Sequence, residues 1–116
     1  MATTLPLLNE TVPVSCCAPL VREPIAADDA ADLARRIKAL ADPTRLRLLS
    51  IVASSQEHEA CVCDLTNPVG LSQPTVSHHL KILTDAGFLS RSKRGTWAYY
   101  ALIPGALDDI AGMLKP

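Results

Sequence analysis

Two pairs of cysteines are the residues of this 116-residue chain best suited to chemistry. Cys61 and Cys63 flank a single valine, and Cys16 and Cys17 are adjacent. Thiolates are soft ligands that bind soft metal ions in preference to Mg²⁺ or Ca²⁺. A helix that begins directly after Cys63 would favour the thiolate form. The two pairs therefore predict a site for a thiophilic metal ion.

Other interpretations of the cysteines stay open at this point. Cys61 and Cys63 could be two small core residues, because free cysteine packs like a hydrophobic side chain. A zinc finger is not indicated, because a second Cys-x-x-Cys or His pair is missing. A thiol enzyme such as an arsenate reductase needs a Cys-x-x-Cys motif or a cysteine in an anion-binding loop, and we find neither, so we expect no enzyme. A thiol-based metal chaperone without a DNA role is the remaining alternative.

The first elements that must position these cysteines follow from proline content, helical periodicity and capping residues. Residues 1–27 contain four prolines and no steady period, so we expect an extended N-terminal arm that carries Cys16 and Cys17. Residues 28–116 are expected to form one domain. Asp28 would cap a helix to about residue 41, and Asp42 a second helix over 43–54. The residues expected on the apolar faces of these two helices are Leu33, Ile37, Leu40, Leu46, Leu49 and Val52.

The second half of the chain predicts a helix-turn-helix followed by a hairpin. Residues 56–60 look like a polar loop and residues 64–69 like a short helix. Ser72 would cap a longer helix that ends at Gly87. Strands over 88–93 and 96–103 would be joined by a turn at Arg94-Gly95, and a last helix follows Pro104. This order predicts a mainly α fold with a small β-hairpin (α+β), the winged helix-turn-helix.

The helix after Ser72 and the hairpin have the residue types of a DNA-binding surface. The net charge is only −1, but residues 72–97 contain four basic residues and one acidic residue, and a local basic face is enough for phosphate contact. Burial of Val76, Leu80 and Leu83 would leave the polar side chains of this helix exposed, and its first turn is where bases are read. The predicted DNA-binding residues are Gln73, Thr75, Ser77, His78, Lys81, Arg91, Lys93 and Arg94.

An ordinary solvated helix face is the alternative to a DNA-reading helix, and the basic hairpin directly after it favours the DNA reader. His79 lies near the buried stripe, so we expect it to pack or cap rather than to contact DNA. Trp97 and Tyr99 alternate on one strand and are expected in the core.

The sequence resembles the ArsR/SmtB family of metalloregulatory repressors over about residues 33–114. The runs that carry the resemblance occur in family order: ALADPTRLRLLSIV, CVCDL, GLSQPTVSHHLKILTDAGFL and KRGTWAYYAL. The resemblance implies a winged-helix homodimer with its first and last helices at the dimer interface. It also implies binding to a palindromic operator without metal and release when metal binds. The family's base-reading positions fall on Gln73, Thr75, Ser77 and His78.

The resemblance also places the site of thiophilic sensors at Cys61 and Cys63. One arsenite-sensing branch has a third cysteine where this chain has Thr66, so the missing thiol must come from elsewhere, and Cys16 and Cys17 are the natural source. An adjacent pair resembles the arm of other arsenite sensors, and As(III) or Sb(III) is therefore the expected inducer. Cd(II) or Pb(II), held by all four cysteines, is the alternative. The zinc ligands of a further branch lie on the last helix, which here has Asp108 and Asp109 but no histidine; we expect these two to be first-turn charges.

The N-terminus lacks a basic region followed by a long apolar core, and no run approaches the roughly 18 apolar residues of a membrane span. We therefore expect a cytoplasmic protein whose thiols are reduced. The expected partners are double-stranded operator DNA and a second copy of the chain, with no membrane and no small organic substrate.

Overall fold

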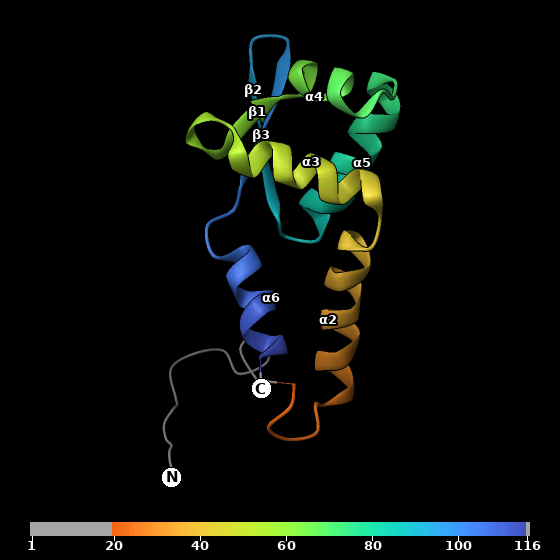
Figure 1. Cartoon of the computed structure of the whole chain (residues 1–116), viewed down its shortest axis with the longest axis vertical. Helices are drawn as coiled ribbons and strands as arrows, with labels where there is room; N and C mark the ends of the chain where they lie inside the picture. Colours follow the sequence, from red (N-terminus) through yellow and green to blue (C-terminus); the bar gives the residue numbers. More distant parts are fainter. Residues whose placement is uncertain (1–19, 116) are drawn as a thin grey trace.

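The computed structural model describes residues 20–115, which form five α-helices and one small antiparallel sheet (Figure 1). The sequence prediction of a mainly α winged helix-turn-helix with a small hairpin is confirmed. The helices are α2 (Ala27–Leu40), α3 (Pro43–Ser54), α4 (Val62–Val69), α5 (Gln73–Asp85) and α6 (Ala106–Leu114). The strands are β1 (Glu59–Cys61), β2 (Leu89–Arg94) and β3 (Trp97–Leu102). Cys16 and Cys17 lie outside the described residues.

The Asp42 cap and the Gly87 turn set helix boundaries as the sequence predicts, but Asp28 does not cap α2: it lies in the first turn, and Ala26 is the N-cap. The Asp42 carboxylate accepts a hydrogen bond from the Arg45 amide at 3.0 Å, and Pro43 occupies the first position of α3. This hydrogen bond lowers the pKa of the Asp42 carboxyl because it stabilises the charged form. After α5, Gly87 adopts a φ of 88°, a left-handed conformation in which glycine carries no steric penalty. The chain can therefore turn directly from α5 into β2.

Strand β1 corrects the sequence prediction, which placed residues 56–60 in a loop. The sheet has the order β1-β3-β2, so β1 pairs with the outer edge of the hairpin. Glu59 lies opposite Ala101, and Cys61 lies opposite Tyr99. Glu57 and His58 turn the chain into β1 with φ values of 58° and 55°. A three-residue strand is too short to show a period of two, which explains why the sequence pattern missed it.

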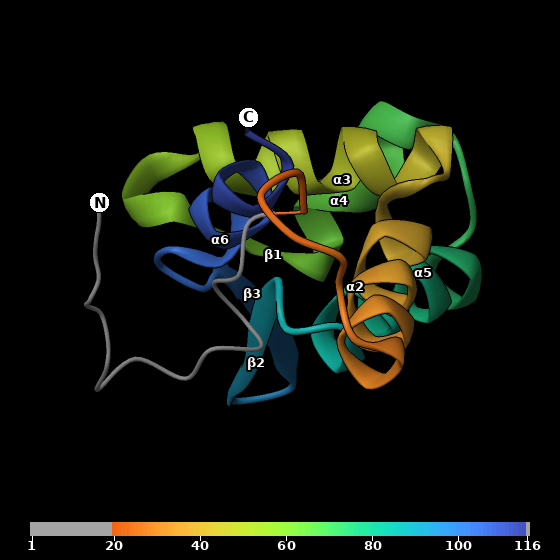
Figure 2. The same cartoon turned by 90° about the horizontal axis from the view of Figure 1, so that it is seen from below.

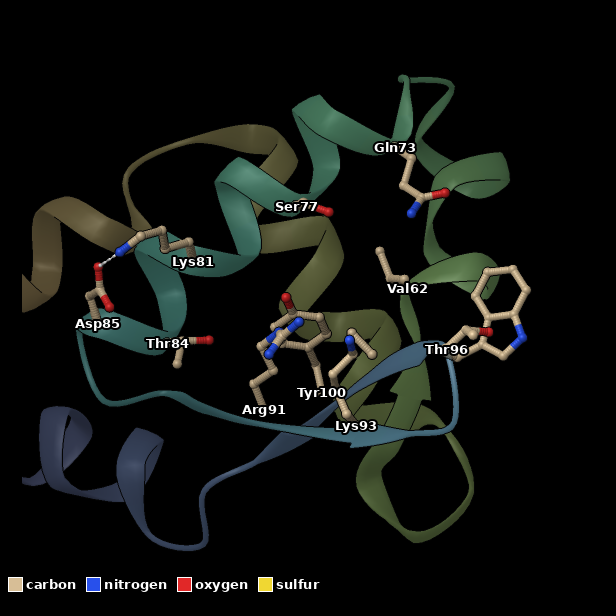
Figure 3. A pocket seen from close by; sticks show the side chains of 12 residues that line it. Val62, Gln73, Ser77, Lys81, Thr84, Asp85, Arg91, Lys93, Thr96 and Tyr100 are labelled. Carbon is tan, nitrogen blue, oxygen red and sulfur yellow. Dashed lines mark hydrogen bonds and ion pairs between the residues drawn. The ribbon is translucent and has the colours of Figure 1, made fainter.

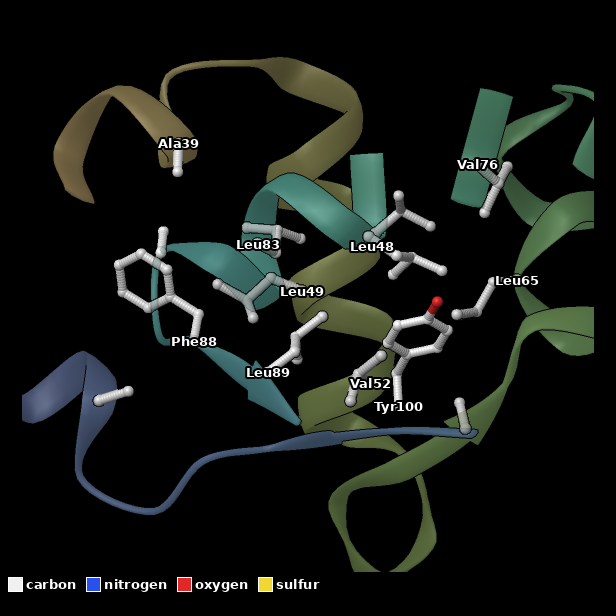
Figure 4. Close-up of a cluster of buried hydrophobic side chains, with 14 of the residues drawn as sticks. Ala39, Leu48, Leu49, Val52, Leu65, Val76, Leu83, Phe88, Leu89 and Tyr100 are labelled. Carbon is white, nitrogen blue, oxygen red and sulfur yellow. The ribbon is translucent and has the colours of Figure 1, made fainter. Parts of the chain in front are cut away.

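The core lies between α3, α4, α5 and the sheet and is almost wholly aliphatic (Figure 4). The predicted stripe of Val76, Leu80 and Leu83 is confirmed, because all three side chains are fully buried. Leu48 of α3 and Phe88, just before β2, are buried to the same extent. Helix α5 is thus fixed to the body by one face, and its opposite face is left for solvent or a partner.

Two residues expected on buried helix faces are exposed instead. Ile37 of α2 and Leu46 of α3 have 36% and 51% of their surface accessible, whereas Ala39 and Leu48 are buried. For Ile37 the reason is visible in Figures 1 and 2, in which α2 and α6 project from the same side of the body. One side of each projecting helix is packed, as buried Leu33 and Ile110 show, and Ile37 lies outside that packed side. Between residues 20 and 115, no helix combines the length and apolar character needed to cross a membrane.

Candidate nucleic-acid interface and thiol pair

A groove of about 580 Å³ lies between α5 and the β2-β3 hairpin (Figure 3). The structure brings five of the eight predicted DNA-binding residues into its walls. Those residues are Gln73, Ser77 and Lys81 from α5, and Arg91 and Lys93 from β2. Helix α5 and the β2-β3 hairpin therefore form the two walls of one groove.

The groove carries mostly positive charge. Lys81 contacts Asp85 at 2.9 Å, but both side chains are well exposed, so water screens this pair. Arg91 and Lys93 are exposed, and neither forms an ion pair with any residue in the described part of the chain. Exposed cations that no carboxylate neutralises suit contact with phosphate oxygens.

Trp97 also lines the groove, which corrects the expectation that it belongs to the core. It is the first residue of β3, directly after the turn, and 48% of its surface is accessible. Core side chains do not reach beyond the end of the hairpin, and this is why Trp97 stays exposed. Tyr99, two residues further on, is half-buried. Trp97 is thus a residue of the candidate interface that the sequence pattern did not identify.

The remaining predicted residues of α5 lie outside the groove. Thr75 and His78 are exposed, and the Thr75 hydroxyl accepts a hydrogen bond from Ser72 at 3.0 Å. His79 is half-buried, with its Nδ1 atom 3.2 Å from Nη1 of Arg45. The expectation that His79 packs against the body is therefore confirmed.

Arg94 differs from the other cations of the hairpin, because its guanidinium is engaged within the chain. Its two terminal nitrogens donate to the two carboxylate oxygens of Glu59 at 2.9 and 2.6 Å. Its central carbon also lies 4.4 Å from the centre of the Tyr99 ring. The hydrogen bonds to Glu59 raise the pKa of Arg94. Two of the five N–H donors of Arg94 are thus occupied within the chain.

Cys61 and Cys63 are brought together at the N-terminus of α4. The structure joins their sulfur atoms in a disulfide, with the Cα atoms 5.1 Å apart. The amide of Cys63 donates to Sγ of Cys61 at 3.2 Å, which makes Cys61 the N-cap of α4. Cys61 is buried and Cys63 is exposed. Two sulfurs that meet at one point fit the donor set of a thiophilic ion once the disulfide is reduced.

The described residues supply only part of such a site. Across residues 20–115, no three or more His, Cys, Asp or Glu side chains come together in an arrangement that would hold a metal ion. Thr66, three residues after Cys63, donates its hydroxyl hydrogen to the carbonyl of Cys63 at 3.4 Å. Val62, between the two cysteines, lines the groove. The thiol pair is therefore next to the candidate DNA surface.

Comparison with known proteins agrees with this geometry. Residues 42–91 match the family model described as "Bacterial regulatory protein, arsR family". The arsenical resistance operon repressor of Bacillus subtilis is 43% identical over 81 residues, a match that covers 70% of this chain and 72% of the relative. The chain belongs to the ArsR family. Because this is a family of helix-turn-helix regulators, the expectation that the chain is not an enzyme is confirmed.

Two further comparisons support this ArsR-family assignment. The arsenic resistance transcriptional regulator ArsR1 of Pseudomonas putida is 45% identical over 78 residues, which is 67% of this chain but only 59% of that regulator. A solved homodimeric winged helix-turn-helix DNA-binding domain from Mycobacterium bovis superimposes with a TM-score of 0.59. It is 30% identical, and the match covers 74% of this chain and 77% of that domain.

Proposed function

We propose that this ArsR-family protein is a metal-responsive transcriptional repressor that binds operator DNA as a homodimer. In this proposal the protein leaves the operator when As(III) or Sb(III) is bound by cysteine thiolates. The observation that carries the proposal is the groove between α5 and the hairpin, which gathers five predicted DNA-binding residues on one basic surface. The arsenic-resistance regulators among its relatives support the choice of inducer.

On DNA, α5 enters the major groove and the hairpin lies over the flanking backbone. Gln73, Thr75, Ser77 and His78 supply hydrogen-bonding groups near the start of α5, where side chains reach base edges. Lys81, Arg91 and Lys93 supply charge for phosphates, and Arg94 contributes less because Glu59 already pairs with it. The buried stripe of α5 holds this exposed face in a fixed orientation.

A second copy of the chain is the proposed partner of the projecting helices. These helices carry exposed apolar side chains, namely Ile37 on α2 and Leu107 and Leu114 on α6. Leu46 of α3 and Leu107 also border an apolar hollow of about 220 Å³. Exposed apolar surface of this kind marks a protein-protein contact. A dimer formed there places two copies of α5 on successive turns of one face of the DNA.

Cys61 and Cys63 bind the inducer in their reduced form, together with Cys16 and Cys17 of the N-terminal arm. As(III) and Sb(III) require three thiolates, whereas Cd(II) or Pb(II) held by all four cysteines is the alternative inducer. Inducer binding then ties the arm to the start of α4, within one subunit or across the dimer. Because Val62 borders the groove, a change at the two cysteines alters the DNA surface itself.

A titration of the reduced protein on DNA tests this function. A labelled duplex from the region upstream of its own gene is bound by the protein, and arsenite, antimonite, cadmium, lead and zinc are added in turn. We expect release at the lowest concentration with arsenite or antimonite. A Cys61→Ser/Cys63→Ser variant is the matched control and should stay on DNA. Failure of the wild-type protein to bind DNA would leave the thiol-based metal chaperone as the better explanation.

A further inference from the structure

The ion pair between Glu59 and Arg94 joins the strand that carries Cys61 to the tip of the hairpin. Three ion pairs occur within residues 20–115, and the other two each lie within a single helix. The Glu59–Arg94 pair instead spans 35 positions of sequence and makes two parallel hydrogen bonds. Such a bidentate pair fixes both the distance and the relative orientation of the guanidinium and the carboxylate, which a single contact does not.

The surroundings of the pair place it beside the thiol site. Glu59 and Cys61 are alternate residues of β1, so their side chains leave the same face of the sheet. Their partners across the strand pair are Ala101 and Tyr99. Arg94 lies over the ring of Tyr99, which is the residue opposite Cys61. The carboxylate, the guanidinium and the ring therefore share the face of the sheet to which the Cys61 side chain belongs.

Backbone pairing alone does not connect β1 to the tip of the hairpin. Strand β1 pairs with residues 99–101 of β3, whereas the turn lies between Arg94 and Trp97, which pair with each other. The side chain of Arg94 reaches back over this distance to Glu59. The ion pair is thus a second attachment between β1 and the hairpin, in addition to the backbone pairing of β1 with β3. It is made at the turn end of the hairpin, where Thr96 and Trp97 line the groove.

We propose that Glu59 and Arg94 are positioning residues that transmit a change at Cys61 to the DNA-contacting tip of the hairpin. This inference rests on the proposed function. When the thiolates of Cys61 and Cys63 bind the inducer, β1 shifts and the ion pair pulls the turn with it. Without the pair, the inducer still binds, but the tip keeps its DNA-binding position.

Trp97, the single tryptophan of the chain, gives a direct probe of the tip. The reduced full-length protein is titrated with sodium arsenite while Trp97 emission is recorded, and operator affinity is measured with and without arsenite. In the wild-type protein we expect arsenite to change the emission and to weaken DNA binding. In Glu59→Gln and Arg94→Gln, both responses should fall at least about fivefold, the lower end of typical allosteric coupling. The number of arsenite ions bound per chain should stay the same.

Two further variants separate a positioning role from a general effect on the fold. Glu57→Gln removes the same charge two residues earlier, where Glu57 makes no contact with Arg94 that qualifies as an ion pair, and should respond like the wild type. The charge-swapped Glu59→Arg/Arg94→Glu double variant re-forms an ion pair and should regain at least part of the response. A merely structural role predicts that the single variants keep the arsenite response, since an exposed pair contributes little to overall stability.

The inference is overturned if Glu59→Gln and Arg94→Gln respond fully, if they lose arsenite binding, or if the charge swap restores nothing. It is also overturned if arsenite leaves Trp97 emission unchanged in the wild type. Failure of the proposed function looks different, because the wild-type protein would then show no operator binding or no release by arsenite.

Discussion

Replacing Lys93 by glutamine should make operator binding weaker and less sensitive to salt. Lys93 is exposed on β2, lines the groove, and forms no ion pair with any residue between 20 and 115. Its ammonium is therefore available to a phosphate, and the contact releases a condensed counterion into solution. Glutamine keeps most of the side-chain length but removes the charge.

The size of the effect follows from counting charges. Each phosphate that a protein neutralises contributes about −0.9 to the slope of log K against log salt concentration on duplex DNA. A homodimer presents Lys93 twice, so Lys93→Gln should make the slope shallower by about 1.8. Arg94→Gln is the matched comparison. Because Glu59 already neutralises Arg94, its loss should change the slope by less than half as much.

Fluorescence anisotropy with a labelled operator duplex, measured from about 50 to 200 mM salt, reads this slope directly. Over that fourfold change, the wild-type affinity should fall about twelvefold further than that of Lys93→Gln. If Lys93→Gln keeps the wild-type slope, Lys93 does not contact a phosphate and the groove is not the DNA surface. If Arg94→Gln lowers the slope as much as Lys93→Gln, the Glu59–Arg94 pair does not persist on DNA.

Three further outcomes follow from the fold and the thiol pair. Leu80→Ala should lower the free energy of unfolding by about 2–5 kcal/mol in urea titrations, because it opens a cavity at a fully buried position. A smaller loss would mean that the side chains around α5 repack into the cavity. The Arg45 amide lowers the pKa of Asp42, so this carboxylate stabilises the fold above the ordinary pKa of aspartate, and the stabilisation is lost as pH falls through the lower folded-state pKa. Asp42→Asn should therefore flatten the acid part of the curve of unfolding free energy against pH. An unchanged acid slope would show that the cap is not formed. Oxidation to the Cys61–Cys63 disulfide should abolish release from DNA by arsenite, and addition of a reductant should restore it; release from the oxidised protein would show that these thiols are not ligands.

The helices and the exposed polar face of α5 could be predicted from the sequence because each depends on the order of neighbouring residues. The period of Val76, Leu80 and Leu83 defines the buried side of α5, and everything opposite is exposed for that reason alone. The Asp42 cap and the Gly87 turn mark where helices start and stop through hydrogen bonding and backbone sterics. These features need no knowledge of distant contacts.

The features that could not be predicted depend on partners far away in the sequence. Strand β1 exists because the edge of β3 is free to accept it, and three residues give no pattern of their own. The Glu59–Arg94 pair depends on that strand in turn. Ile37 and Leu46 have the periodicity of buried residues, but the packing of the single chain leaves both of them exposed. The exposure of Trp97 follows from its position at the end of the hairpin, which a count of alternating residues does not reveal.

The strand order β1-β3-β2 has a consequence for how the molecule opens. Strand β1 lies at the edge of the sheet, so it can detach while the β2-β3 hairpin stays paired. Amide protons of β1 should therefore exchange with solvent by a local opening, whereas those of β3, with a neighbour on each side, should need the whole sheet to separate. The buried cysteine at the end of β1 would be uncovered by that same small opening. Access of a reagent to Cys61 then depends on a low-energy fluctuation of three residues, and α5 keeps its place while it happens.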